Sequence, residues 1–519
     1  MSGAPKAILA LAALAAGLVF AGCGEDDLAD SGPPSVTPES APVYVDVSVR
    51  PEGEARDDAE AALGRILGTE DPGQRVIELA EQQAAQEGDE FDYEQDVEPW
   101  LGERFAIFLT TIGGDTTDSQ GGFVFETTDV ETALEFLRSA PDSTGRTEEH
   151  EGVEFEFDTD GDVFGAVGDF IVGGDEAAFK AAVDAHDGDS LGDSDEFDDA
   201  VEELSEDRLS TLYVPPEQFL EAVSDQELDP QARDFLKRAL GEAGDQPILG
   251  EVTASAESVT IELSAGGSVE TSESGLLAEL PGDAWFAVGF ADVGAAVQGG
   301  LQQVEQARIP GLDGAAIREQ LRNQSGINLE QDVIATLGDA ALFVQGTSVN
   351  SVGGALVVES KNPETSAQLL TKLQDLISRE APPQVKVQPI ASATGDQGFQ
   401  ISGRAAGLQQ PISVIQRQNR IIAGYGRAAV NQALGSDGGA AQPLSGSPAF
   451  KGAQDAVGEL GIDALLSFAP AIQLTEAAGA GADPDYKQAK PYLDSLDFLA
   501  LGSGNDDDRS QLRFVVGLE

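Results

Sequence analysis

The sequence is poor in the residues on which most catalytic and metal sites depend. Its 519 residues include one cysteine, two histidines, one methionine and two tryptophans. With a single cysteine, no disulfide can form within the chain, so the fold must rest on its hydrophobic core. At this length, a hydrophobic content of 41% is enough for two ordinary domains.

Familiar catalytic motifs are missing too. The chain contains no His-Glu-x-x-His, no Gly-x-Ser-x-Gly, no phosphate-binding loop and no serine three residues before a lysine. His150 and His186 lie in polar surroundings that are typical of solvated surface residues. We therefore predict no cofactor and a non-enzymatic protein that binds a ligand or partner. A carboxylate- or metal-dependent hydrolase stays open as the alternative, because paired carboxylates leave no motif.

Basic residues are scarce: 29 Lys and Arg face 93 Asp and Glu, which gives a formal net charge of −64. The excess is uneven, with 64 acids against 12 bases in 24–266 and 29 against 16 in 267–519. Repulsion excludes nucleic acid as a partner and disfavours direct docking on anionic lipid headgroups. Two interpretations remain for the acidic first half. Its surface is merely solvated, or it binds divalent cations or a basic envelope partner.

One loop in the acidic half is a weak candidate for a cation site. Asp158, Asp160 and Asp162 alternate along the chain, as acids do at the start of a calcium loop. However, the sixth position is valine rather than glycine, and the twelfth is aspartate rather than glutamate. The alternative is a hairpin between 153–157 and 163–167, since Asp-Gly is a strong turn signal.

The N-terminus predicts a lipoprotein. Residues 1–22 contain an apolar run, Ala7 to Phe20, that is too short to span a bilayer but has the length of a signal-peptide core. The following Ala-Gly-Cys resembles a lipobox, and its Cys23 is the one cysteine of the chain. Residues 23–42 then form an acidic tether rich in Pro, Ser and Gly. We expect lipid on Cys23 to anchor the protein to the extracytoplasmic face of the cell membrane.

The remaining chain repeats itself. Val43–Val49, with its four valines on one face, has the alternation of a half-buried strand, and Trp285–Phe290 is its counterpart. Further segments of the first half recur in the second half in the same order. They include a Leu-Gly-acid sequence before an apolar strand, and a strand that is followed by a helix. Each half ends in a predicted hairpin, at 248–263 and at 496–518, the second with its turn at 502–506.

These matches predict two homologous tandem units, 43–266 and 278–519. Hairpins imply antiparallel pairing, and helices are interspersed with the strands. The first unit should have a helix that begins with Thr128 and Glu131 at capping-box spacing, and the second a helix with Asn362 as its N-cap. The predicted fold class is α+β, each unit an antiparallel sheet with helices packed on it.

With these features, the chain resembles actinobacterial lipoproteins that carry an uncharacterised domain, DUF3352. The segments that carry the resemblance are Tyr44–Pro51, Asp96–Gly102, Gly168–Asp184 and Asp189–Phe197. The resemblance implies a lipoprotein of similar duplicated build. The family has no assigned activity, so no site residue carries over.

The uneven charge makes a prediction about stability. Self-repulsion destabilises a compact acidic unit, and salt screens it, with a Debye length of ~10 Å at 0.1 M and ~3 Å at 1 M. In thermal unfolding of 43–266 and 278–519 expressed separately, sodium chloride should therefore raise the Tm of the first unit more. An equal salt response in both units would contradict this expectation.

Overall fold

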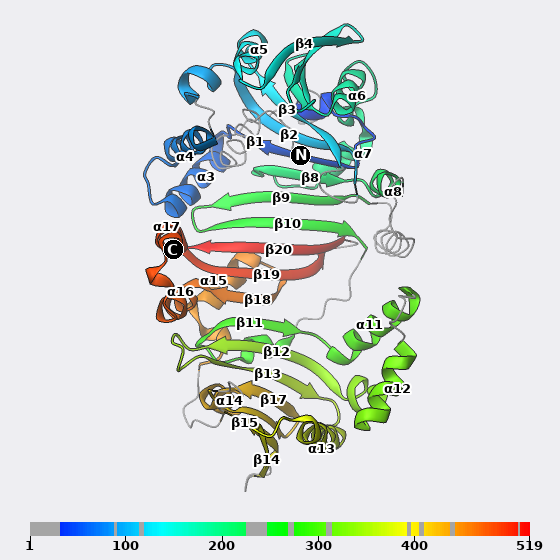
Figure 1. Cartoon of the computed structure of the whole chain (residues 1–519), viewed down its shortest axis with the longest axis vertical. Coiled ribbons are helices and arrows are strands. Elements are labelled where there is room, and N and C mark those ends of the chain that lie inside the picture. Colours follow the sequence, from blue (N-terminus) through cyan, green and yellow to red (C-terminus); the bar gives the residue numbers. More distant parts are fainter. Residues whose placement is uncertain are drawn as a thin grey trace. The chain divides into compact units, whose positions relative to one another are not determined.

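The computed structural model describes residues 32–87, 91–113, 119–224, 246–267, 274–307, 314–391, 396–403, 409–435, 442–506 and 509–519. The chain divides into two compact units. The first contains the described residues up to Gly267 with Asp506–Leu512 and Leu518, and the second contains the intervening residues with Arg513–Gly517 and Glu519. Each unit combines helices with an antiparallel sheet (Figure 1), which confirms the predicted α+β class.

The first unit begins with a short 3-10 turn, η1 (Pro33–Val36), and contains two further short helical turns and six described helices. The turns are η2 (Tyr93–Val97) and η3 (Leu191–Asp193), and the helices are α3 (Gly53–Leu67), α4 (Pro72–Glu87), α5 (Val130–Ser139), α6 (Glu176–His186), α7 (Asp195–Val201) and α8 (Pro216–Ser224). Its strands are β1 (Val43–Ser48), β2 (Leu101–Thr111), β3 (Gln120–Thr127), β4 (Ser143–His150), β5 (Val153–Asp158), β6 (Val163–Val167), β7 (Phe170–Gly174), β8 (Ser210–Val214), β9 (Ile248–Ser255) and β10 (Ser258–Gly266).

The second unit has eight described helices and ten strands. The helices are α10 (Gly275–Glu279), α11 (Val293–Ala307), α12 (Gly314–Ser325), α13 (Pro363–Glu380), α14 (Arg427–Ala433), α15 (Pro448–Val457), α16 (Phe468–Ala477) and α17 (Pro484–Leu493). The strands are β11 (Ala284–Phe290), β12 (Leu337–Gln345), β13 (Gly353–Ser360), β14 (Lys386–Ala391), β15 (Gln397–Ser402), β16 (Ile412–Arg417), β17 (Arg420–Tyr425), β18 (Gly461–Ser467), β19 (Leu496–Asp506) and β20 (Arg509–Leu518).

Strand pairing follows the same order in both units. In the first unit the order across the sheet is β4-β5-β6-β7-β3-β2-β1-β8-β9-β10. In the second it is β14-β15-β16-β17-β13-β12-β11-β18-β19-β20. Every one of these pairs whose register is described is antiparallel. The predicted terminal hairpins are present, but β19 runs through Asp506, so the turn predicted at 502–506 is wrong.

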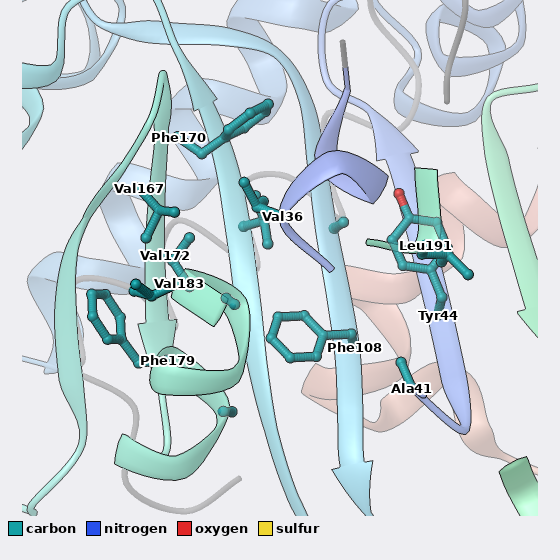
Figure 2. Packing of buried hydrophobic residues seen from close by; sticks show 14 of the residues in the cluster. Val36, Ala41, Tyr44, Phe108, Val167, Phe170, Val172, Phe179, Val183 and Leu191 are labelled. Atoms are coloured by element: carbon teal, nitrogen blue, oxygen red, sulfur yellow. The ribbon is translucent and has the colours of Figure 1, made fainter. Parts of the chain in front are cut away.

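Apolar side chains pack on both sides of the first unit's sheet. On one side, Tyr44, Phe108, Val172 and Phe179 form a core with α6 and η3, which Figure 2 shows from close by. On the other side, a second cluster is built around the fully buried Trp100 and includes residues of α4 and α5. Helices therefore cover both faces of this part of the sheet.

The more deeply buried side of β1 is the opposite of the one that its valines suggest. Tyr44, Asp46 and Ser48 are buried, whereas Val43, Val45 and Val47 are half-buried. Asp46 is tolerated there because Arg104 lies 3.1 Å from its carboxylate and the Thr211 N–H donates to it at 3.1 Å. The alternation predicted the strand correctly, but hydrogen-bonding partners from other strands decide which face is buried.

Two helix starts test the predicted caps. The helix α13 begins as expected, since the Asn362 side chain accepts from the Thr365 N–H and Pro363 occupies the first turn. The capping box predicted at Thr128 is wrong. The N-cap of α5 is Asp129, whose side chain accepts from the Thr132 N–H.

Candidate functional site

The residues singled out in the sequence lie in different settings. Cys23 lies outside the described residues. Asp158, Asp160 and Asp162 lie in the turn between β5 and β6, which pair antiparallel as a hairpin. Neither histidine joins them: His150 lies 2.7 Å from Asp184, and His186 is exposed at the end of α6. Among the described residues, no three His, Cys, Asp or Glu side chains form a set that could hold a metal ion.

Asp158 organises the hairpin turn. Its Oδ1 accepts from the backbone N–H groups of Asp160, Gly161 and Asp162 at 2.9, 2.7 and 2.9 Å. Its Oδ2 is buried and has no hydrogen-bond partner among the residues that the structure describes. The Gly161 φ of 100° is one that L side chains rarely adopt, so the Asp-Gly turn chemistry explains the sequence pattern.

Asp162 is the carboxyl of this turn with the larger pKa shift. Burial, followed by the charges of Asp158, Asp175 and Asp160, raises the pKa of Asp162 to about 6. Burial also raises the pKa of Asp158, although the three backbone donors oppose this shift. These acids thus repel one another in a partly desolvated turn, and ionisation of Asp162 carries a cost in the folded state.

A polar hollow of about 540 Å³ lies at the start of α13. It is lined by Pro363, Glu364, Ala367, Gln368, Thr371, Gln397, Gln416 and Gln418. The Gln416 amide is used within the fold, since it donates to the carbonyls of Pro363 and Gln418. The Gln416 amide N–H groups are therefore not free to bind a ligand in this hollow.

The most distinctive surface of the second unit is one side of its sheet. Two rows of apolar residues cross β12, β11, β18 and β19, each residue directly opposite the next in the strand register. The first row is Leu342, Val288, Ala464 and Leu501, and the second is Val344, Phe286, Leu466 and Leu499. We call these eight residues the open face.

The opposite side of the same strands is a conventional core. Phe343, Ala287, Leu465 and Phe498 alternate with the open-face residues and are at most 5% exposed, packed with α10, α14 and α15. By contrast, all eight open-face residues are half-buried or exposed, and Leu499 is 37% exposed. Phe290, next along β11 on the same side, is 49% exposed.

Helices cover only part of the open side of this sheet. Leu370 of α13 packs with Ala340, Val358 and Ile421, so the part of this side formed by β13 and β17 is covered. Towards β18 and β19, α16 contacts β11 but none of its residues is buried. Figure 1 shows α16 and α17 near one end of these strands and α11 and α12 near the other.

An acid lies at the margin of the open face. Asp497 precedes Leu499 by two residues on β19, which places it on the same side of the strand. Burial raises the pKa of its carboxyl, and it has no hydrogen bond or ion pair with any other residue that the structure describes. The open face thus consists of aliphatic and aromatic side chains with one carboxyl at its margin, which suits a ligand that is mainly apolar.

The sequence contained a signal for this surface that periodicity did not reveal. Solvent-facing sheets usually alternate apolar and polar residues, whereas strands apolar on both sides are expected to be buried on both. Trp285–Phe290 and 498–501 are apolar on both sides. Such strands predict two covering layers, and the described part of the chain supplies only one over the open face.

The turn carboxyl makes a pH prediction. A raised pKa means that the folded state favours neutral Asp162, so its ionisation removes stability as the pH rises from about 4 through 6. The neutral variant Asp162→Asn should therefore raise the Tm at pH 7.5 and have little effect at pH 4. Asp189→Asn is the matched control, because Asp189 is exposed in the same unit and is not among the charges that raise the pKa of Asp162.

A different result would favour a cation at this turn. Calcium would then raise the Tm of the unaltered protein by more than its ionic strength explains, and Asp162→Asn would abolish that increase. A lower Tm for Asp162→Asn at pH 7.5 without calcium would contradict the repulsion described above.

Comparison with known proteins places the chain in a family without an assigned activity. No curated protein matches it. Three solved structures titled crystal forms III, IV and I of TP0453 resemble the chain at 11%, 12% and 11% sequence identity, respectively. The alignments cover 79%, 80% and 79% of this chain and 99%, 98% and 98% of the solved chains. Their TM-scores are 0.17, 0.16 and 0.18. These scores are too low to support an argument about fold. The model of the family described as protein of unknown function (DUF3352) matches residues 6–460, and the chain belongs to this family.

Proposed function

We propose that the protein is a lipid-anchored extracytoplasmic binding protein that acts without catalysis and holds an apolar ligand on the open face of its second unit. The single observation that carries the binding function is the contrast between the two sides of β11, β18 and β19. Both sides are apolar, and within the described part of the chain only one is buried under helices, since α16 contacts β11 on the other side without burying any of its own residues. Apolar patches that remain exposed to water commonly mark binding sites.

The location rests on the sequence. An apolar run of signal-peptide length, the lipobox-like residues before Cys23 and the acidic segment directly after it support a lipid anchor at the cell envelope. The predicted tether of residues 23–42 is too long, because Val36 and Ala41 are buried in the core of the first unit. None of the described helices has the length and apolar character needed to cross a membrane. The shared strand order supports the further proposal that the two units are copies of one ancestral fold.

The alternative, a carboxylate- or metal-dependent hydrolase, is favoured by one feature, the raised pKa of Asp162. A general acid must reach its substrate, and a second carboxylate must work with it. The neighbouring Asp158 carboxylate is instead engaged with three backbone N–H groups of its own turn. For that reason we prefer the binding function.

The anchor predicts a change in fractionation. Cys23→Ala removes the acylated thiol, so the protein should be unprocessed or released rather than acylated and membrane-bound. The measurement is cell fractionation with metabolic labelling by a fatty acid, and Asp26→Asn, just beyond the cysteine, is the control. An acylated, membrane-bound Cys23→Ala protein would refute the anchor.

The open face predicts binding of a neutral, environment-sensitive dye such as Nile red. Leu499→Asp places a charge on the face, at the β19 end of its second row, and should reduce dye affinity about tenfold or more, since burying an unpaired charge is costly. Val349→Asp is the matched control, because Val349 is 46% exposed in the same unit but lies outside the open face. Equal loss in both variants, or no dye binding by the unaltered protein, would contradict the proposed function.

A further inference from the structure

We propose that the occupant of the open face is the alkyl chain of an amphiphile with a neutral or cationic headgroup. This inference rests on the binding function proposed above and specifies its ligand. It follows from three properties of the face: the absence of hydrogen-bonding groups in its two rows, its size, and the sign of the charge at its margin.

The first property is that the face offers no directional contacts. All eight side chains in the two rows are apolar. The backbone is already in use, since β11 pairs with both β12 and β18, and β18 pairs with both β11 and β19. A peptide strand therefore has no free sheet edge to join here. A protein interface usually makes about one hydrogen bond per 100–200 Å², which these rows cannot supply.

The second property is size. Four neighbouring strands span about 14 Å between the outer two, and residues two apart on a strand are separated by about 7 Å. With the side chains included, the two rows present a few hundred Å² at most. A stable protein partner usually covers about 800 Å² on each side. The face is thus small for a second copy of the chain, whose charge of −64 would also repel it, and it suits an alkyl chain.

The third property is charge. No Lys or Arg belongs to the two rows, and the acid at their margin, Asp497, has no partner among the described residues. An anionic headgroup would meet this carboxylate and the negative field of the whole protein. A neutral headgroup avoids both, and a cationic headgroup gains an ion pair with Asp497. The alkyl chain would then lie along Leu499 and Leu501 with its headgroup near Asp497.

The test is displacement of Nile red from the full-length protein by three dodecyl compounds below their micelle concentrations. Dodecyltrimethylammonium should bind roughly two- to fivefold more tightly than neutral monododecanoylglycerol, as expected for a half-exposed ion pair. Dodecanoate should bind most weakly. Leu499→Asp should weaken the neutral compound, whereas Val349→Asp should not.

Asp497→Asn separates the charge from the apolar contacts. It should bring the affinity for the cationic compound down to about that for the neutral one. Asp494→Asn is the control, because it removes one charge nearby from a carboxylate that pairs with Lys490 at 2.8 Å. Ultracentrifugation of the same samples reports whether the unaltered protein is monomeric.

Three results would overturn the inference. One is Leu499-dependent dye binding that no dodecyl compound displaces, which would leave the proposed function standing but reject an alkyl ligand. Another is dodecanoate binding as tightly as the other two compounds. The third is a dimer that Leu499→Asp converts to a monomer, which would identify a second copy as the occupant. Absence of dye binding, by contrast, would reject the proposed function itself.

Discussion

Strands β11, β18 and β19 of the second unit carry apolar side chains on both sides, and the helices that the structure describes bury only one of those sides. Burying apolar area is worth about 25 cal/mol per Å², so the covered side stabilises the fold. Phe343 and Leu465, at most 1% exposed, lie on that side. The uncovered side contributes less to stability, since Leu499 and Phe290 remain exposed. Apolar residues that contribute little to folding suggest a role in binding.

The two units place comparable strands in different surroundings. In the first, β1 buries a carboxylate, Asp46, which is paired with Arg104, and leaves its valines half-buried. In the second, β11 occupies the same place in the strand order and has an apolar core on one side and Phe286 and Val288 on the other. One strand order therefore supports a buried ion pair in one unit and an open apolar face in the other. If the units arose by duplication, their corresponding strands have diverged in the chemistry they present.

The acidic composition acts on the molecule as a whole. A net charge of −64 repels anionic surfaces. This repulsion opposes adsorption of the exposed apolar face on an anionic bilayer. The same charge opposes self-association through that face. In the proposed function, repulsion at long range would restrict an apolar surface, which has little selectivity of its own, to neutral or cationic ligands.

Much of the fold could be predicted from the sequence, because alternation, caps and turns are local properties. The α+β class, the hairpins and the Asn362 cap followed from residues close together in the chain. The buried side of β1 did not, because Asp46 is satisfied by Arg104 and Thr211, which lie far away in sequence. The open face could not be predicted for a similar reason. Its apolar residues look like core until the covering helices are located, and only tertiary structure locates them.

The central claim is that the open face binds an apolar ligand, and methyl-resolved NMR of the full-length protein tests it most directly. Val288, Leu342, Leu466, Leu499 and Leu501 supply methyl groups to the face, while Leu465 and Val515 supply methyl groups to the core behind it. On titration with monododecanoylglycerol, the account predicts shifts that saturate at the five face residues and are small at the two core residues. Shifts confined to other surfaces, or none at the face at saturating ligand, would contradict it.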